Sequence, residues 1–229
     1  MYKNNKHRNV SALIDGVLIE EADIINMELS RAHHALNFLK SKIDPNMMHS
    51  IMARELLETT NKSEKWVSES EGKWQSNSVL LTVDGLSADD FHLYFMGLIK
   101  NNNEPEIRAA HPDHYRNRIL SGGPEIIENI GEDNYPWHVF GRFISVSDIP
   151  AFEQEKSFDI SFGLEVKSVN DNVIAYAGHE LRNFKSGMQA KLTIVLPYLA
   201  EKTLVRGHLN HFAVEFRNWC LSAPSSTDI

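Results

Sequence analysis

The chain has 229 residues, and its 31 aspartates and glutamates outnumber its 23 lysines and arginines, so the net charge is −8 with histidine neutral. This length suits one domain, or one domain with an extension, that buries a core without disulfides. The acidic balance argues against nucleic acid and against an anionic membrane surface, because both attract clustered basic residues. The single cysteine, the absence of a signal-peptide pattern and the lack of an apolar stretch near ~18 residues predict a cytoplasmic protein. The 11 histidines are the one unusual feature of the composition.

Residues 1–65 are predicted to form an arm followed by helices. Residues 1–21 show little pattern, whereas residues 22–60 carry apolar side chains with the period of one helical face. Asp44 and Pro45 look like an N-cap followed by proline at the first helical position, so a second helix is predicted to start there. Two amphipathic helices outside the main domain would suit a dimer interface, and we therefore expect a possible homodimer.

From residue 73 the pattern changes to the β-branched and alternating pattern of strands. Segment 73–83 is a candidate strand, and an amphipathic helix is predicted to start at Ser87. Further candidate strands are 125–130, 137–146, 158–166, 173–181 and 188–196, and a long helix is predicted over 198–221. Strands in series with hairpin-like turns favour an antiparallel sheet in an α+β fold, and a curved sheet around one helix would enclose a ligand cavity.

The terminal helix carries His211 and Glu215 at a spacing of four residues, which places both side chains on one face. Two such side chains suit a shared metal ion, and a surface ion pair is the alternative interpretation. His208 and Asn218 lie on the same face, beside the apolar stripe, and would look into a pocket between helix and sheet.

Segment 111–117 holds two histidines, an acid, a phenol and an amide within seven residues. Pro112 biases His111 toward an extended conformation, so we expect a loop that enters a short helical turn. The alternative is a turn capped by Asp113 that carries exposed histidines.

Two candidate strands each carry one polar residue that would take part in a binding or catalytic site. If Ile127 faces outward, Glu128 faces the concave side of the sheet, where a carboxylate must be neutral, paired or bound to a metal. In the alternative register Ile126 and Glu128 are both exposed. Period-two alternation places His179 on the same strand face as small apolar residues, as expected for a pocket histidine. A core or edge histidine fits the same pattern.

In chain order these features resemble the diacetylphloroglucinol hydrolase family, which includes phloretin hydrolase-like enzymes. The matching segments read EGKWQSNSVLLTVDG, SADDFHLYFMGL, HPDHYRN, PEIIENIG, AGHELRNFKSGMQAKLTIVLP and HLNHFAVEF. The resemblance implies a helix-grip fold, similar to START and Bet v 1 domains, in which an antiparallel sheet wraps a long C-terminal helix. The implied organisation is an N-terminal helical extension over 1–65, a helix-grip catalytic domain over 66–222 and a tail over 223–229.

The resemblance also implies a mononuclear zinc site with two histidines and two glutamates. Carried over position by position, the ligands are His114, Glu128, His211 and Glu215. His111 competes with His114 for this role because the spacing from the His-Pro pair looks one residue shorter than in the family. The family usually has aromatic residues, including a tyrosine, before this motif, where the present chain reads Glu-Pro-Glu-Ile-Arg-Ala-Ala. This departure leaves the substrate open, with Tyr115 and Tyr176 as candidate replacements for the missing phenol.

The implied activity is zinc-dependent hydrolysis of the carbon–carbon bond between an acyl group and a phloroglucinol-type ring. Asn117 would hold a substrate oxygen and His179 would act as acid or base. The expected substrate-binding residues are His111, Tyr115, Trp74 and Phe95, with core packing as the alternative for each aromatic ring. Two rival functions are a non-catalytic module that binds a hydrophobic ligand and a polyketide cyclase or dehydratase on the same scaffold.

Overall fold

The computed structural model describes residues 9–131 and 135–224, and it divides the chain into two compact units, Met1–Asp44 and Pro45–Ile229. The boundary predicted at residue 65 falls inside the helix Ala53–Glu69, so this helix groups with the sheet and not with the N-terminal extension. Residues 1–8 of the predicted arm and 225–229 of the predicted tail lie outside the described residues.

The first unit consists of a hairpin, β1 (Ala12–Ile14) and β2 (Val17–Ile19), and the helix α1 (Glu21–Lys42). Asp15 and Gly16 form the turn with φ of 51° and 81°, and two positive φ values are what a two-residue hairpin turn of the Asp-Gly kind requires. The sequence did not predict this hairpin, because strands of three residues are too short to show alternation.

Large apolar side chains of the first unit are exposed along both the hairpin and α1. They are Leu13, Ile14, Val17, Leu18, Ile25, Met27, Leu29, Phe38 and Leu39. Such a surface is compatible with the expected homodimer, because monomeric proteins seldom expose a large apolar patch. The homodimer stays a prediction, which sedimentation velocity on the full chain would check.

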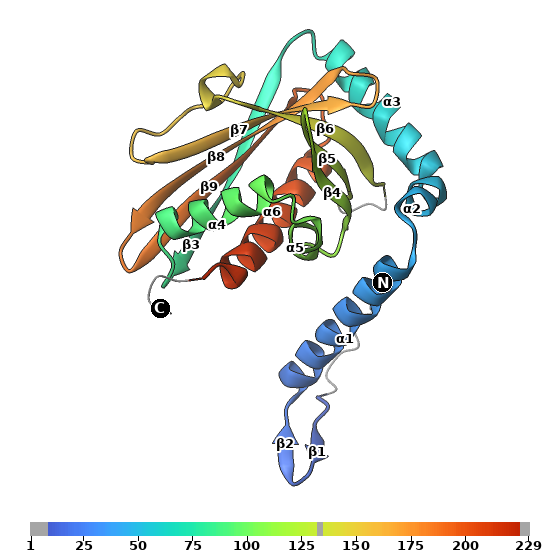
Figure 1. The fold of residues 1–229 in the computed structure, drawn as a ribbon, viewed down its shortest axis with the longest axis vertical. Helices are drawn as coiled ribbons and strands as arrows, with labels where there is room; N and C mark the ends of the chain where they lie inside the picture. The colour runs from blue at the N-terminus through green and yellow to red at the C-terminus, as the bar shows by residue number, and fades with distance from the viewer. Residues whose placement is uncertain (1–8, 132–134, 225–229) are drawn as a thin grey trace. The chain divides into compact units, whose positions relative to one another are not determined.

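The second unit begins with α2 (Pro45–Ile51) and α3 (Ala53–Glu69), and a helix does start at Pro45 as predicted. The strands that follow are β3 (Trp74–Asp84), β4 (His114–Leu120), β5 (Gly123–Glu128), β6 (Trp137–Ile144), β7 (Ile160–Ser168), β8 (Val173–Phe184) and β9 (Gly187–Pro197). Between them lie the helices α4 (Ala88–Lys100) and α5 (Glu104–Ala109) and a 3-10 turn, η1 (Val146–Asp148). The long helix α6 (Lys202–Ser222) closes the described chain (Figure 1).

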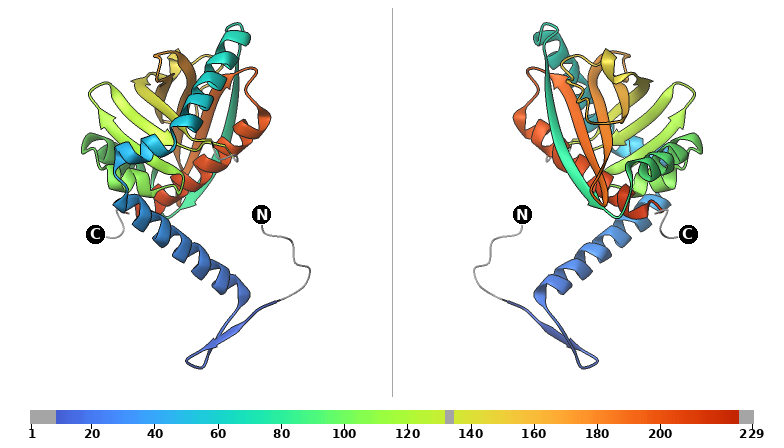
Figure 2. Two further views of the ribbon diagram at one scale, coloured as in Figure 1. Left: turned by 90° about the vertical axis from the view of Figure 1, so that its right-hand side faces the viewer. Right: turned by 90° about the vertical axis from the view of Figure 1, so that its left-hand side faces the viewer.

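The strands form one antiparallel sheet in the order β3-β9-β8-β7-β6-β5-β4. The sheet curves around α6, which contacts β3 and β9 (Figures 1 and 2). The predicted α+β helix-grip fold is therefore confirmed. Among the described residues, no helix is both long and apolar enough to cross a membrane.

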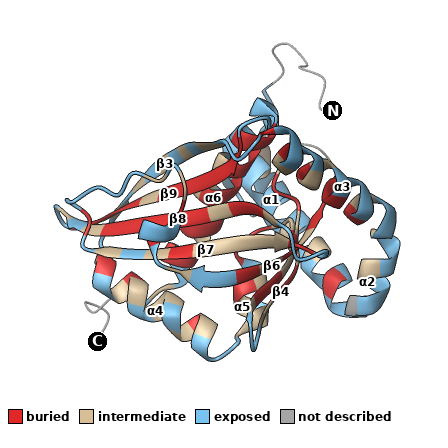
Figure 3. Ribbon diagram, turned by 90° about the horizontal axis from the view of Figure 1, so that it is seen from above, coloured by how far each residue is buried: buried red, intermediate tan, exposed pale blue. Residues whose placement is uncertain are grey.

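The core lies between the inner face of the sheet and α6. Buried residues follow β8, β9 and one side of α6 (Figure 3). On α6 the buried side chains recur every three or four residues, as one helical face requires, and they include Leu204, His208, Phe212, Phe216 and Trp219. The same face therefore carries both the apolar core and the polar residues of interest.

Candidate metal centre and its cavity

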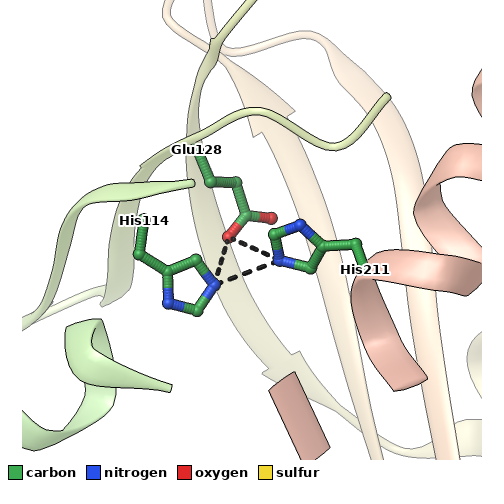
Figure 4. Close-up of side chains that lie close together, drawn as sticks. All are labelled: His114, Glu128 and His211. Carbon is green, nitrogen blue, oxygen red and sulfur yellow. Dashed lines mark hydrogen bonds and ion pairs between the residues drawn. The ribbon is translucent and has the colours of Figure 1, made fainter. Parts of the chain in front are cut away.

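Four side chains that the sequence singled out meet beneath α6. His114 is the first residue of β4 and Glu128 is the last residue of β5, and the two are paired directly across the strands. His211 and Glu215 reach the same point from α6. His114 Nε2 lies 3.1 Å from His211 Nε2 and 3.3 Å from both Glu128 Oε2 and Glu215 Oε1 (Figure 4 shows the first three residues).

A β-bulge at Tyr115 gives His114 its direction. The pairing of β4 with β5 shifts register between His114 and Arg116, so one extra residue is accommodated there. Without this shift, His114 and Asn117 would point to opposite faces of the sheet, because side chains alternate along a strand. With it, His114 points to the cluster while Asn117 lines the cavity beside it. The short helical turn that the sequence predicted here is wrong, and β4 takes its place.

The outer nitrogens of both histidines face backbone carbonyl groups. His114 Nδ1 is 3.3 Å from the Ile107 carbonyl oxygen, and His211 Nδ1 is 3.1 Å from that of Asn129. A carbonyl oxygen only accepts, so each Nδ1 carries the proton and donates it. If both rings are neutral, each Nε2 presents a lone pair to the other, and a proton or a metal ion between the two nitrogens would remove this repulsion.

The donor set fits a zinc ion. Imidazole nitrogen and carboxylate oxygen bind Zn²⁺ at about 2.0–2.2 Å in a tetrahedron, which separates neighbouring ligand atoms by roughly 3.3–3.5 Å. The distances of 3.1, 3.3 and 3.3 Å, and the 3.7 Å from His211 Nε2 to Glu128 Oε2, fall around that value. The geometry of His114, Glu128 and His211 therefore suits a small divalent cation held by nitrogen and oxygen alone. Glu215 adjoins this group through its contact with His114.

Burial and mutual repulsion shift the pKa values of the cluster. Burial raises the pKa of Glu128 to about 7. Burial would lower the pKa of His114, but the carboxylates of Glu215 and Glu128 outweigh it and raise that pKa. Burial, with the neighbouring His114 and His111, lowers the pKa of His211 well below its ordinary value. Two carboxylates beside two imidazoles thus leave a local demand for positive charge, which a proton on His114 or a metal ion would meet.

His111 lies next to the cluster but uses its ring differently. Its Nδ1 accepts a hydrogen bond from the backbone N–H of Asp113 at 3.0 Å, which closes the turn before β4. Its ring stacks on His211 with the centroids 3.8 Å apart. Of the two competing histidines, the structure brings His114 to the group formed with Glu128 and His211, and it leaves His111 as a neighbour that packs against His211.

An apolar cavity of about 150 Å³ lies between the sheet and α6, beside the cluster. A cavity of that size holds about one benzene ring. Glu128 and Glu215 reach its wall, and Asn117, His179 and Phe95 line it as the sequence anticipated. Trp137 also lines it, and most of the other lining side chains are aliphatic or aromatic, among them Ile126, Ile194, Phe212 and Phe216.

Three of the four expected substrate-binding residues, His111, Tyr115 and Trp74, do not line this cavity. Trp74 packs against Tyr176, with ring centroids 5.2 Å apart, beside the separate cluster of Val146, Ile149 and Val195. The alternation of β3 directs Trp74 to that outer face, so the predicted substrate-binding role of Trp74 is wrong. Tyr115 is the extra residue of the bulge, and its side chain does not line the cavity either. Neither Tyr115 nor Tyr176 therefore supplies a phenol to the cavity.

His208 also belongs to the cavity, although no catalytic, metal-binding or substrate-binding role was expected for it from the sequence. It lines the cavity one turn before His211 on α6. The carbonyl groups of Ile107 and Asn129, which orient the two cluster histidines, could not be found from the sequence. Backbone acceptors depend on the path of the chain, and side-chain patterns carry no signal for them.

The fold and this site define a helix-grip protein with a buried histidine–glutamate cluster beside an apolar cavity. No family model and no curated protein matches the chain. The crystal structure of Ara h 8.0201 matches with a TM-score of 0.40 and 8% identity, over 66% of this chain and 99% of that one. A putative uncharacterized protein from Rhizobium leguminosarum matches with a TM-score of 0.36 and 11% identity, over 65% and 95%. Neither likeness is close enough to bear on function.

The buried His179 predicts an acid-sensitive fold. Burial lowers the pKa of His179 to about 3, whereas the unfolded residue titrates near ~6.5. The stability that the neutral ring contributes is therefore present above pH ~6.5 and is lost as the pH falls toward the folded pKa, by roughly 1.4 kcal/mol per pH unit. We expect His179→Phe to weaken the pH dependence of the unfolding free energy in this window, as measured by urea denaturation. His34→Phe on the exposed side of α1 is the control, and parallel profiles for wild type and His179→Phe would contradict the prediction.

Proposed function

We propose that the chain is a metal-dependent hydrolase that cleaves the carbon–carbon bond between an acyl group and a phenolic ring. The observation that carries the proposal is the convergence of His114, Glu128, His211 and Glu215 at the wall of a cavity sized for one ring. A structural ion-pair cluster has no need of an adjoining apolar cavity. The substrate class comes from the sequence resemblance, and zinc is the proposed metal.

The four cluster residues would hold the metal, and the other polar residues of the cavity would hold the substrate. A bound zinc ion would lower the pKa of a water molecule to about 7 and would polarise an acyl carbonyl group. The side-chain amide of Asn117 would donate to a phenolic oxygen or to the developing oxyanion. The carboxylate oxygens of Glu128 and Glu215, which line the cavity, would accept a proton from water.

The role of His179 differs from the one that an ordinary histidine would play. The sequence predicted an acid or base that titrates near ~6.5. Since burial lowers the pKa of His179 to about 3, its ring is neutral at pH 7. We therefore assign His179 to hydrogen bonding with a substrate oxygen, and not to storing a proton between turnovers.

Product analysis with acylated phenols tests the proposed activity. Zinc-loaded protein incubated with mono- or diacetylphloroglucinol is expected to release acetic acid and the deacylated phenol. Liquid chromatography with mass detection measures both products. Glu128→Gln is expected to lose more than the roughly 10–100-fold that removal of an outer partner of a metal site costs. Glu69→Gln makes the same change at an exposed position of α3 and should keep full activity. No acid product from either substrate with zinc bound would overturn the proposed activity.

A non-catalytic ligand-binding module is the second candidate. The predominantly apolar lining of the cavity favours it, because such a lining binds a hydrophobic ring without any chemistry. In that case the same incubation would return the phenol unchanged although it binds. Binding without turnover therefore separates the two functions.

A further inference from the structure

We propose that His208 is a specificity-determining residue that forms a hydrogen bond with an oxygen substituent on the ligand's aromatic ring. This contact would be separate from the metal centre. The inference deepens the proposed function, because it assumes that the cavity binds an oxygenated aromatic ring. It would also hold for a binding module without catalysis.

The first observation is the position of His208. Its side chain lines the cavity, and only 7% of the residue is exposed. It lies on α6 one turn before His211, and the two rings meet edge to face with centroids 5.9 Å apart. His208 thus borders the metal centre, but it does not join the group of His114, Glu128 and His211.

The second observation is that Nδ1 of His208 has no hydrogen-bond partner among the described residues. A buried polar group left without a partner costs about 1–3 kcal/mol, so folded proteins seldom keep one. His114 and His211 show the usual arrangement, because each directs its Nδ1 at a backbone carbonyl. His208 therefore lacks the backbone anchor that fixes the rings of the two cluster histidines.

His179 on β8 shares both properties. Its Nδ1 is also buried without a partner, and it lines the same cavity. Both rings pack against Phe212, with centroids 4.4 Å away for His208 and 5.1 Å away for His179. Two imidazoles from opposite layers of the fold therefore border the apolar cavity and contact the same phenylalanine.

The chemistry of the ring defines what it recognises. A neutral imidazole has one N–H donor and one lone pair, on different nitrogens. The Nδ1 atom of His208 is shut off from the cavity by surrounding atoms, so Nε2 is the nitrogen left to meet a ligand. That nitrogen suits a phenolic hydroxyl, a phenolate or a carbonyl oxygen, and it offers nothing to an unsubstituted ring edge.

Ligand binding to full-length protein tests this assignment without any need for turnover. Trp137 and Trp219 line the cavity, so quenching of tryptophan fluorescence reports binding. The probes are 2,4,6-trihydroxytoluene and toluene, which have no acyl group to be cleaved and differ only in ring oxygens. Wild type should prefer the hydroxylated probe, and His208→Phe should reduce that preference about tenfold, which corresponds to ~1.4 kcal/mol. His208→Gln keeps an amide donor and should retain part of the preference.

His92→Phe is the matched control, because Nδ1 of His92 is also buried without a partner although the residue does not line the cavity. Thermal melts and zinc uptake are measured on every variant, so that a folding defect or a disturbed metal centre is recognised. An unchanged ratio of the two dissociation constants in both His208 variants would overturn the inference, as would failure of both probes to bind wild type. A ratio that depends on His208, without acid product, would uphold the inference and reject the hydrolase.

Discussion

Elemental analysis of the purified chain is expected to return about one zinc ion per molecule, and His211→Ala and Glu128→Ala are each expected to abolish it. The donor atoms of His114, Glu128 and His211 lie 3.1 to 3.7 Å apart, and Glu215 contacts His114 at 3.3 Å. The outer nitrogens of both histidines are already held by carbonyl groups. A prearranged site of this kind loses its metal when one of four ligands is removed, because the remaining donors leave the charge and the coordination incomplete.

His179→Phe supplies the control for metal content. Its ring lines the cavity and contacts Phe162, Phe212 and Phe216, so the variant should keep its zinc. Added zinc should also raise the melting temperature of wild type, since a ligand that binds only the folded state stabilises it. Wild-type protein that contains no zinc and takes up none from solution would reject the proposed centre, and with it the hydrolase.

Replacement of Phe216 by alanine is expected to destabilise the second unit by about 3–5 kcal/mol. Phe216 is 1% exposed and lies between Phe91, Phe95 and Trp219, with ring centroids 5.2 to 6.1 Å away. The loss is expected at the upper end of the range, because the existing cavity on one side leaves few atoms that would move in to fill the gap. Chemical denaturation followed by circular dichroism measures the change.

Phe143→Ala removes the same ring where it borders the cavity at a position that is 46% exposed. A half-exposed ring buries less apolar surface, so this variant should lose clearly less stability than Phe216→Ala. If both variants lost similar stability, Phe216 would not be a central core residue, and the arrangement of α6 against the sheet would be in doubt.

The strands that carry regular alternation were predictable from the sequence alone. Six predicted strands correspond to β3 and to β5 through β9, with shifts of a few residues at their ends. Strand β4 was missed, because His114–Leu120 is a polar segment whose burial comes from its neighbours and not from its own composition. The helix predicted from residue 198 begins at Lys202, because the chain turns after β9 before α6 starts.

The candidate site was only partly predictable for a related reason. The spacing of His211 and Glu215 placed both on one helical face, and a helix keeps that relation wherever it packs. Whether His111 or His114 joined them depended on the bulge at Tyr115, which a single sequence does not reveal. The direction of Trp74 likewise depended on which face of β3 the sheet turned inward.

The sequence by itself determined the local periods, the turn positions and the types of donor atom, because these depend on neighbours within a few residues. With its single cysteine it also confined any metal centre to nitrogen and oxygen ligands. Only the tertiary structure decided which donors meet. That decision rests on strand register, on one β-bulge and on the position of α6 across the sheet, and these arise from packing between segments far apart in the chain.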